Sequence, residues 1–132
     1  MLLVGTNVLV DVVQDDPQWA NWSISQMRAQ ASIHQLAINP VIYAEISLSF
    51  STLEALDSVV ATLALELRQI PRPALFLAAK AYAKYRKRGG TRLQVLPDFF
   101  IGAHAAVERW PLLTRDASRF RTYFPTLEVL AP

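Results

Sequence analysis

Residues 1–13 read MLLVGTNVLVDVV, a short apolar run that leads through one glycine into a second apolar stretch. The run from Leu2 to Val4 is typical of a fully buried strand in the middle of a parallel sheet. The residues from 7 to 14 have the pattern of a helix. Turns from strand to helix are favoured ligand-binding places in α/β proteins. The residue at this turn is Gly5, so either the backbone requires a glycine or a functional side chain is missing.

The rest of the chain alternates helices with short apolar strands, and proline or glycine marks most of the boundaries. We expect further helices at about 17–30, 40–50, 52–66, 73–87 and 97–109, and further strands at about 36–38, 67–70, 111–114 and 127–130. This alternation indicates a parallel sheet with helices on both faces. No linker, repeat or low-complexity tract interrupts it, so we expect one domain over residues 1–132.

The composition excludes several classes of protein. Of 132 residues, 52% are hydrophobic, which excludes a disordered chain. No apolar run approaches the ~20 residues that a membrane helix needs, and no basic segment precedes the first apolar run, so we expect neither a membrane anchor nor a signal peptide. The absence of cysteine excludes disulfides, thiolate catalysis and cysteine-bound zinc, and it fits a cytoplasmic protein.

The net charge of +2 is small, but the basic residues are unevenly distributed. One cluster without any acidic residue contains Lys80, Lys84, Arg86, Lys87, Arg88 and Arg92. A looser group follows, with Arg109, Arg115, Arg119 and Arg121. Such clusters on a nearly neutral chain favour an anionic partner, with nucleic acid first. A solvated helix end explains the first cluster equally well, because Lys and Arg suit the last turn of a helix.

Glu45 is an acidic residue in an apolar setting. On a helix it shares a face with Val41, Ile42 and Leu48. A buried carboxylate is costly unless a positive group meets it. A functional role is therefore one explanation, and an arginine ion pair or an exposed face is the other.

Two further acids stand at ends of expected elements. Asp98 falls in the first turn of an almost uncharged helix, where it could also simply complement the helix dipole. Asp116 follows a strand and could be a turn residue or a helix cap.

Together, Glu45, Asp98 and Asp116 carry more weight, because all three could meet in one crevice at the carboxyl edge of the sheet. Carboxylates held close together need a cation, and hard oxygen ligands favour Mg²⁺ or Mn²⁺ over zinc. Such a site beside a basic groove is suited to phosphodiester hydrolysis. His34 and His104 have no partner at metal-ligand spacing, and no Ser-His-Asp arrangement is present.

Four stretches in order, LLVGTNVLVDV, NPVIYAEI, LPDFFIGAHA and LLTRDASRF, resemble the PIN-domain ribonucleases, in particular the VapC-type toxins of bacterial toxin–antitoxin pairs. The resemblance covers essentially the whole chain. It implies a three-layer α/β/α sandwich with a mostly parallel sheet of about five strands. It further implies an Mg²⁺- or Mn²⁺-dependent endoribonuclease that forms a homodimer and is neutralised by a cognate antitoxin protein.

The resemblance also implies site residues. By position, Glu45, Asp98 and Asp116 match three of the family's four catalytic acids, with Asp98 and Asp116 among the metal ligands. Thr6 and Asn7 match the residues after the first acid, and Thr114 is a supporting residue. The expected RNA contacts are Lys84, Arg86, Lys87, Arg88, Arg92 and Arg115.

Gly5 departs from the family pattern, since the family places its first metal-binding aspartate there. The loss should impair catalysis and metal binding more than folding. An Asp-to-Gly change needs only one base, and a toxic protein selects for inactive copies during cloning, which favours an inactivating substitution. A natural glycine would instead favour a non-catalytic module that binds RNA or protein on the same fold. A flavodoxin-like signalling domain would need a late lysine, and no lysine follows Lys87.

Overall fold

A five-stranded parallel sheet organises the chain in the computed structural model, which describes residues 1–132. The strand order is β3-β2-β1-β4-β5, and every neighbouring pair is parallel. The strands are β1 (Leu2–Val4), β2 (Leu36–Ile38), β3 (Glu66–Leu67), β4 (Leu112–Leu113) and β5 (Val129–Leu130). The expected class of fold, an α/β/α sandwich around a parallel sheet of about five strands, is confirmed.

Seven α-helices and two 3₁₀ turns connect the strands. The helices are α1 (Thr6–Val13), α2 (Ala20–Ala31), α3 (Pro40–Ile46), α4 (Leu53–Thr62), α5 (Arg72–Lys87), α6 (Leu96–Glu108) and α7 (Ser118–Tyr123). The 3₁₀ turns are η1 (Ser47–Ser49) and η2 (Leu93–Val95). None of the helices has the length and hydrophobicity required to traverse a bilayer.

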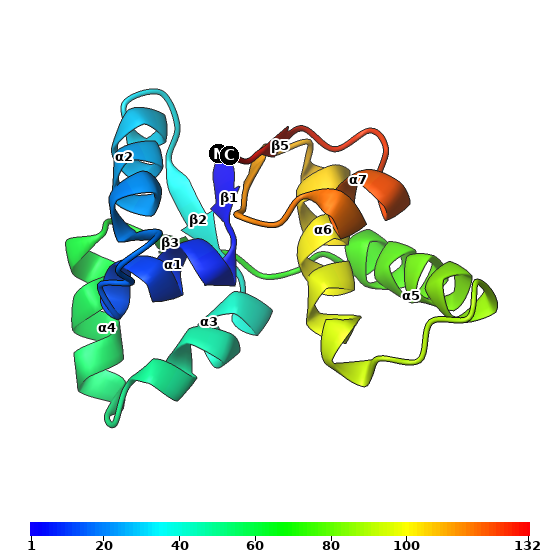
Figure 1. Ribbon diagram of the computed structural model, residues 1–132, viewed down its shortest axis with the longest axis horizontal. Helices are drawn as coiled ribbons and strands as arrows, with labels where there is room; N and C mark the ends of the chain where they lie inside the picture. The colour runs from blue at the N-terminus through cyan, green and yellow to red at the C-terminus, as the bar shows by residue number, and fades with distance from the viewer.

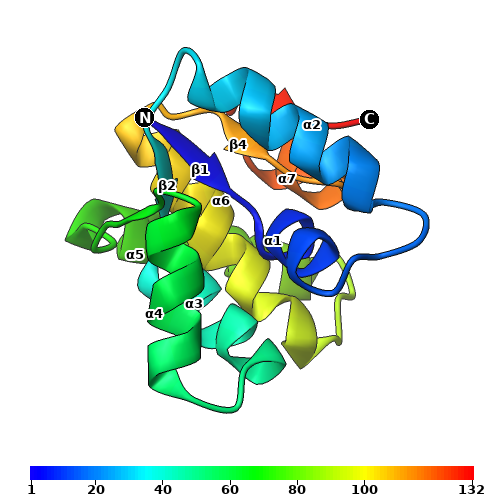
Figure 2. The ribbon, with the colours of Figure 1, turned by 90° about the vertical axis from the view of Figure 1, so that its left-hand side faces the viewer.

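The helices cover both faces of the sheet. In Figure 1, α1, α2 and α4 lie on one side of β1 and β2, and α5, α6 and α7 lie on the other. Figure 2 looks from the first side and shows α2 and α4 flanking β1, with α6 behind the strand. Helix α3 packs against both α1 and α6, and it therefore links the two layers at one end of the sheet.

Local sequence signals explain most of the element boundaries. Asn39 caps α3, because its Oδ1 accepts a hydrogen bond of 2.9 Å from the Ile42 amide, and Pro40 fits the first turn. Thr52 caps α4 in the same way. Ser47 donates to the Tyr43 carbonyl, and the chain changes there from α-helix to 3₁₀ geometry. The helix expected over 40–50 is consequently divided in two.

Strand β3 is shorter than expected and lies outside the core. It has two residues, both exposed, where the sequence predicts a strand over 67–70. Only the Arg68 amide continues the pairing, through a bond of 2.8 Å to the Ile38 carbonyl. β3 is an edge strand, and edge strands are commonly short because a long exposed edge promotes pairing with other chains.

The strand order places a topological switch point between β1 and β4. The chain leaves β1 toward β2 on one side, and the other half of the sheet continues from β4 to β5. In open α/β sheets, ligands bind beyond the carboxyl ends of the strands at such a point. Gly5 follows β1 and Thr114 follows β4, so both residues lie at the switch point.

Candidate functional site

Gly5 joins β1 to α1 and is buried. Its φ of −67° and ψ of 153° are extended values that any residue adopts, so the backbone conformation does not require glycine. The surroundings are tighter, because the Gly5 amide donates to the Leu113 carbonyl at 2.8 Å. A Cβ on Gly5 would lie 2.9 Å from that carbonyl oxygen. Any side chain here therefore requires a small shift of the backbone between β1 and β4.

Thr6 links the first turn of α1 to Glu45 on α3. The Thr6 hydroxyl donates to Glu45 Oε1 at 2.6 Å, across 39 residues of sequence. Burial raises the Glu45 pKa, the Thr6 hydrogen bond opposes that rise, and the charge of Asp98 adds to it. Glu45 is thus a fixed, partly desolvated carboxyl group, as its apolar sequence setting suggested.

Asn7 fixes the chain that follows β4. Its Nδ2 donates a hydrogen bond of 3.3 Å to the Thr114 hydroxyl, and its Oδ1 accepts one of 3.3 Å from the Arg115 amide. Thr114 is 2% exposed, and its hydroxyl also accepts from the Asp116 amide at 3.3 Å. These contacts bring together Asn7, Thr114 and Asp116, three of the residues that the resemblance marks.

Asp98 is held by an arginine. In the first turn of α6, its Oδ2 accepts a bond of 2.6 Å from a terminal nitrogen of Arg119 on α7. Burial raises the Asp98 pKa and the charge of Asp116 adds to the rise, whereas Arg119 lowers the pKa. The charge of Asp98 thus acts on Glu45, and the charge of Asp116 acts on Asp98.

The acids as they stand do not fit a metal ion. No three His, Asp or Glu side chains of the chain meet closely enough to hold one. Glu45 and Asp98 are each engaged by a hydrogen-bond donor, and Gly5 contributes no ligand. Asp116 is exposed, and its Oδ1 contacts the Ser118 hydroxyl at 3.3 Å. The arrangement is an acidic centre that the chain itself partly neutralises.

A partly buried ion pair beside this centre was not predicted from the sequence. Asp11 on α1 is 2% exposed and accepts two bonds from the Arg115 guanidinium, at 2.9 and 3.0 Å. Ser23 on α2 donates to the same carboxylate at 2.9 Å, and the guanidinium lies 5.3 Å from the Trp19 ring centroid. In the sequence, the helical position of Asp11 on the buried face of α1 was the available signal. Arg115, expected to contact RNA, is engaged here.

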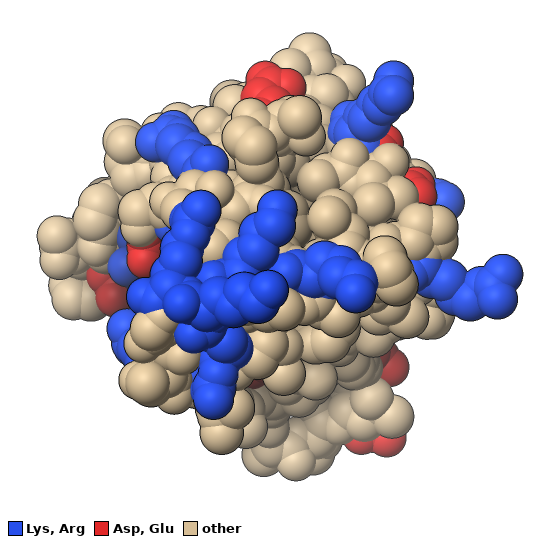
Figure 3. Space-filling view, turned by 90° about the vertical axis from the view of Figure 1, so that its right-hand side faces the viewer, with Lys and Arg blue, Asp and Glu red and all other residues tan.

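The basic cluster predicted from the sequence is exposed on α5 and the segment after it. All of its members are exposed, namely Lys80, Lys84, Arg86, Lys87, Arg88 and Arg92. Figure 3 looks at the α5–α7 side, where Lys and Arg side chains gather and acidic ones are sparse. The segment from 88 to 95 connects α5 to α6, whose first turn carries Asp98. The cluster is thus joined to the acidic centre by one short connection.

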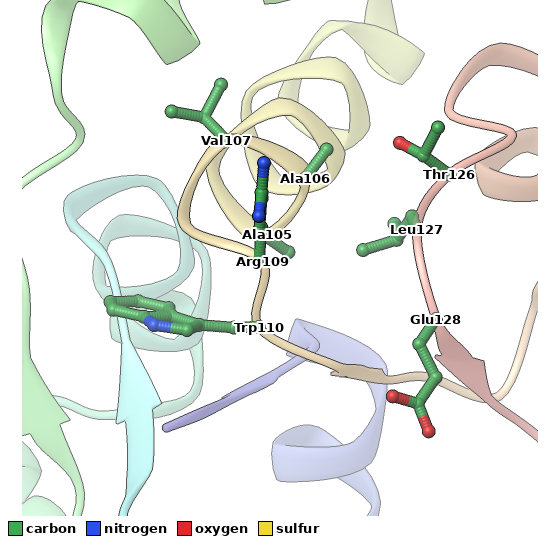
Figure 4. A pocket seen from close by; sticks show the side chains of 8 residues that line it. All are labelled: Ala105, Ala106, Val107, Arg109, Trp110, Thr126, Leu127 and Glu128. Carbon is green, nitrogen blue, oxygen red and sulfur yellow. The ribbon is translucent and has the colours of Figure 1, made fainter.

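One hollow of the molecule lies away from these acids. It has a volume of about 700 Å³ and is formed by the end of α6, by Trp110 and by the segment from 126 to 128. Figure 4 shows Leu127 pointing across it toward α6. Trp110 precedes β4 and Glu128 precedes β5, so the hollow lies at the amino ends of the strands, opposite the acids.

Comparisons with known proteins agree with this architecture. The family model described as "PIN domain" matches residues 2–124. No curated protein matches the sequence.

Several solved structures share the fold at low sequence identity. A chain of VapBC2 from Rickettsia felis, bound to a promoter DNA fragment, has a TM-score of 0.76 at 19% identity, covering 99% of this chain and 98% of its own. A chain of VapBC-1 from nontypeable Haemophilus influenzae has a TM-score of 0.74 at 15% identity, and the match covers 98% of this chain and 96% of its own. A chain of a toxin–antitoxin complex from Klebsiella pneumoniae has a TM-score of 0.69 at 20% identity, and the match again covers 98% of this chain and 96% of its own.

Proposed function

Because this chain belongs to the PIN domain family, we propose that it is the toxin partner of a VapC-type toxin–antitoxin pair. On this proposal it acts on RNA in the cytoplasm, and Gly5 impairs its cutting activity. PIN-domain nucleases generally use divalent metal ions. The observation that carries the proposal is the carboxyl edge, where Gly5, Thr6–Glu45 and Thr114–Asp116 surround the switch point.

The chain's own residues have separable roles in this proposal. The exposed cations Lys84, Arg86, Lys87, Arg88 and Arg92 hold the RNA backbone through its phosphates. Thr6 orients Glu45 through Oε1, which leaves Oε2 of that carboxyl group to hold or take a proton. Asn7 and Thr114 fix the segment that carries Asp116.

The structural neighbours support a protein partner for this chain. The Klebsiella structure is described as a toxin–antitoxin complex, and the Rickettsia structure as VapBC2 bound to promoter DNA. We therefore propose that this chain is neutralised by a cognate antitoxin protein. From the family resemblance alone, we further propose that it forms a homodimer.

The proposal is tested by changing Gly5→Asp. In antitoxin-free protein, with Mg²⁺ or Mn²⁺ and total RNA, we expect cleavage to rise about 10²–10³-fold, by analogy with other charged groups that stabilise a transition state. Mapping of the cut sites would identify the RNA class. Circular dichroism must accompany the assay, because a Cβ at this position would meet the Leu113 carbonyl at 2.9 Å.

Two control variants make this experiment decisive. Gly5→Ala introduces the same Cβ without a carboxylate and should leave cleavage at its starting level. Asp98→Asn, added to Gly5→Asp, should abolish the gain. A folded Gly5→Asp protein that cuts no RNA would refute the nuclease proposal.

A second candidate is a non-catalytic module that binds RNA or protein on the same fold. The absence of any three-ligand acidic group favours it. Such a module would show no Asp98-dependent Mg²⁺ uptake in calorimetry, even after Gly5→Asp. Its RNA affinity would be the same before and after the substitution.

A further inference from the structure

We propose that Arg119 takes the place of a metal ion in this chain, so that the acidic centre is neutralised from within by a guanidinium group. The inference deepens the proposed function and rests on it for the identity of the centre. Its test measures cation binding, not RNA cleavage, so the two can fail separately.

The first argument is the contact itself. The Arg119 terminal nitrogen and Asp98 Oδ2 are 2.6 Å apart, and the two side chains are only 23% and 35% exposed. A charge-assisted hydrogen bond in a partly desolvated place is considerably stronger than a surface ion pair. Arginine also stays charged at any physiological pH. A cation that binds Asp98 must therefore displace a permanent and well-placed competitor.

The second argument is that helix packing brings Arg119 to this position. Its neighbour Phe120 is 5% exposed and anchors α7 in the core. Phe124, just after α7, lies against Gly102 of α6 so closely that a Cβ there would come within 2.5 Å of the ring. The bare surface at Gly102 thus permits the close docking of α7 on α6, the helix that carries Asp98.

The third argument is that the neighbouring arginines have other contacts. Arg115 is bound to Asp11, and the Arg88 guanidinium lies 5.3 Å from the Tyr123 ring centroid. Arg119 is thus the cation paired with an acid of the centre. With glycine at position 5, three carboxyl groups remain at the centre. A single arginine offsets a larger share of the charge of three carboxylates than of the charge of four.

Mn²⁺ binding provides the test, measured by calorimetry at neutral pH and low salt. We expect weak binding to the unaltered chain and at least about tenfold tighter binding to Arg119→Gln. The matched control is Arg121→Gln, an exposed arginine on the same helix, which should leave affinity unchanged. Adding Asp98→Asn to Arg119→Gln should remove the gained affinity. Arg119→Lys, which keeps the positive charge, should remain near the unaltered chain.

The same comparison is made in the Gly5→Asp background, where the additional carboxylate supplies a stronger site. If Arg119→Gln binds Mn²⁺ no more tightly than its parent in both backgrounds, the inference is overturned. Thermal melting of each variant establishes folding, and Arg119→Met replaces Arg119→Gln if the latter does not fold. If the affinities shift as expected while Gly5→Asp cuts no RNA, the inference stands and the nuclease proposal fails.

Discussion

His104 shows how a single buried residue couples stability to pH. It is completely buried on α6, and its Nδ1 lies 3.1 Å from Asn39 Nδ2, whereas its Nε2 has no hydrogen-bond partner. Burial, with a smaller effect of Arg68, lowers the His104 pKa to about 4. The ring is therefore neutral at physiological pH and accepts a bond from the residue that caps α3.

We expect His104 to make the protein less stable as the pH falls. The unfolded chain takes up the His104 proton below a pKa near 6.5, and the folded chain only near 4. The stability that the neutral His104 ring contributes is fully present above the unfolded-state pKa of 6.5. It is lost as the pH falls from 6.5 to about 4. At ~1.4 kcal/mol per pKa unit, its upper limit is about 3 kcal/mol.

Urea denaturation at pH 7.0, 5.5 and 4.5 checks this expectation. His104→Gln cannot titrate, and its stability should depend less on pH than that of the unaltered chain. His34→Gln, at a partly exposed histidine, should retain the full dependence. If the free energy of unfolding of His104→Gln depended on pH as steeply as that of the unaltered chain, His104 would not be the source of the pH dependence.

At the scale of elements, the Asp11–Arg115 pair ties three segments together. It joins α1 to the chain after β4, and Ser23 adds α2. Because Asp11 is buried whereas Arg115 is 31% exposed, we expect Asp11→Ala to cost about 2–3 kcal/mol, less than a fully buried pair would. Asp11→Ala and Arg115→Gln together should cost less than the sum of the single changes.

The Glu66–Arg68 pair is the control for this cycle. Both of its side chains are 43% exposed, so its removal should cost less than about 1 kcal/mol. Equilibrium denaturation of the single and double variants measures both cycles. Additive effects at Asp11 and Arg115 would mean that their contact contributes no coupling energy.

The sequence predicted elements better than it predicted their ends and contacts. Apolar runs and capping residues located β1, β2 and α5 to within a residue, because these signals are local. The short β3 depends on its position at the edge of the sheet, which no local signal encodes. The Asp98–Arg119 and Asp11–Arg115 contacts join residues 21 and 104 positions apart, so only the folded chain reveals them.

At the scale of the whole molecule, basic side chains gather on one face (Figure 3). The α5–α7 side carries the exposed basic cluster (Figure 3). Replacing Lys84, Arg86, Lys87 and Arg88 together by Gln should weaken RNA binding and lower the slope of log affinity against log salt. At ~0.7 per phosphate contact on single strands, four contacts predict a decrease of up to about 3.

Filter-binding titrations at salt concentrations from about 50 to 200 mM measure this slope. Arg28→Gln, on α2 of the opposite side, is the control and should leave the slope unchanged. If the slope of log affinity against log salt were unchanged in the fourfold variant, the basic cluster would not contact RNA and would be an ordinary solvated surface.

The central place of β1 in the sheet also has a consequence for how the chain folds during synthesis. Leu3 pairs with Ala37 of β2 on one side and with Leu112 of β4 on the other. The second neighbour leaves the ribosome only after most of the chain has been made. Until then, one edge of an apolar strand lacks its partner, and such edges promote aggregation. Completion of the sheet is therefore a late step of folding, set by the distance along the chain between β1 and β4.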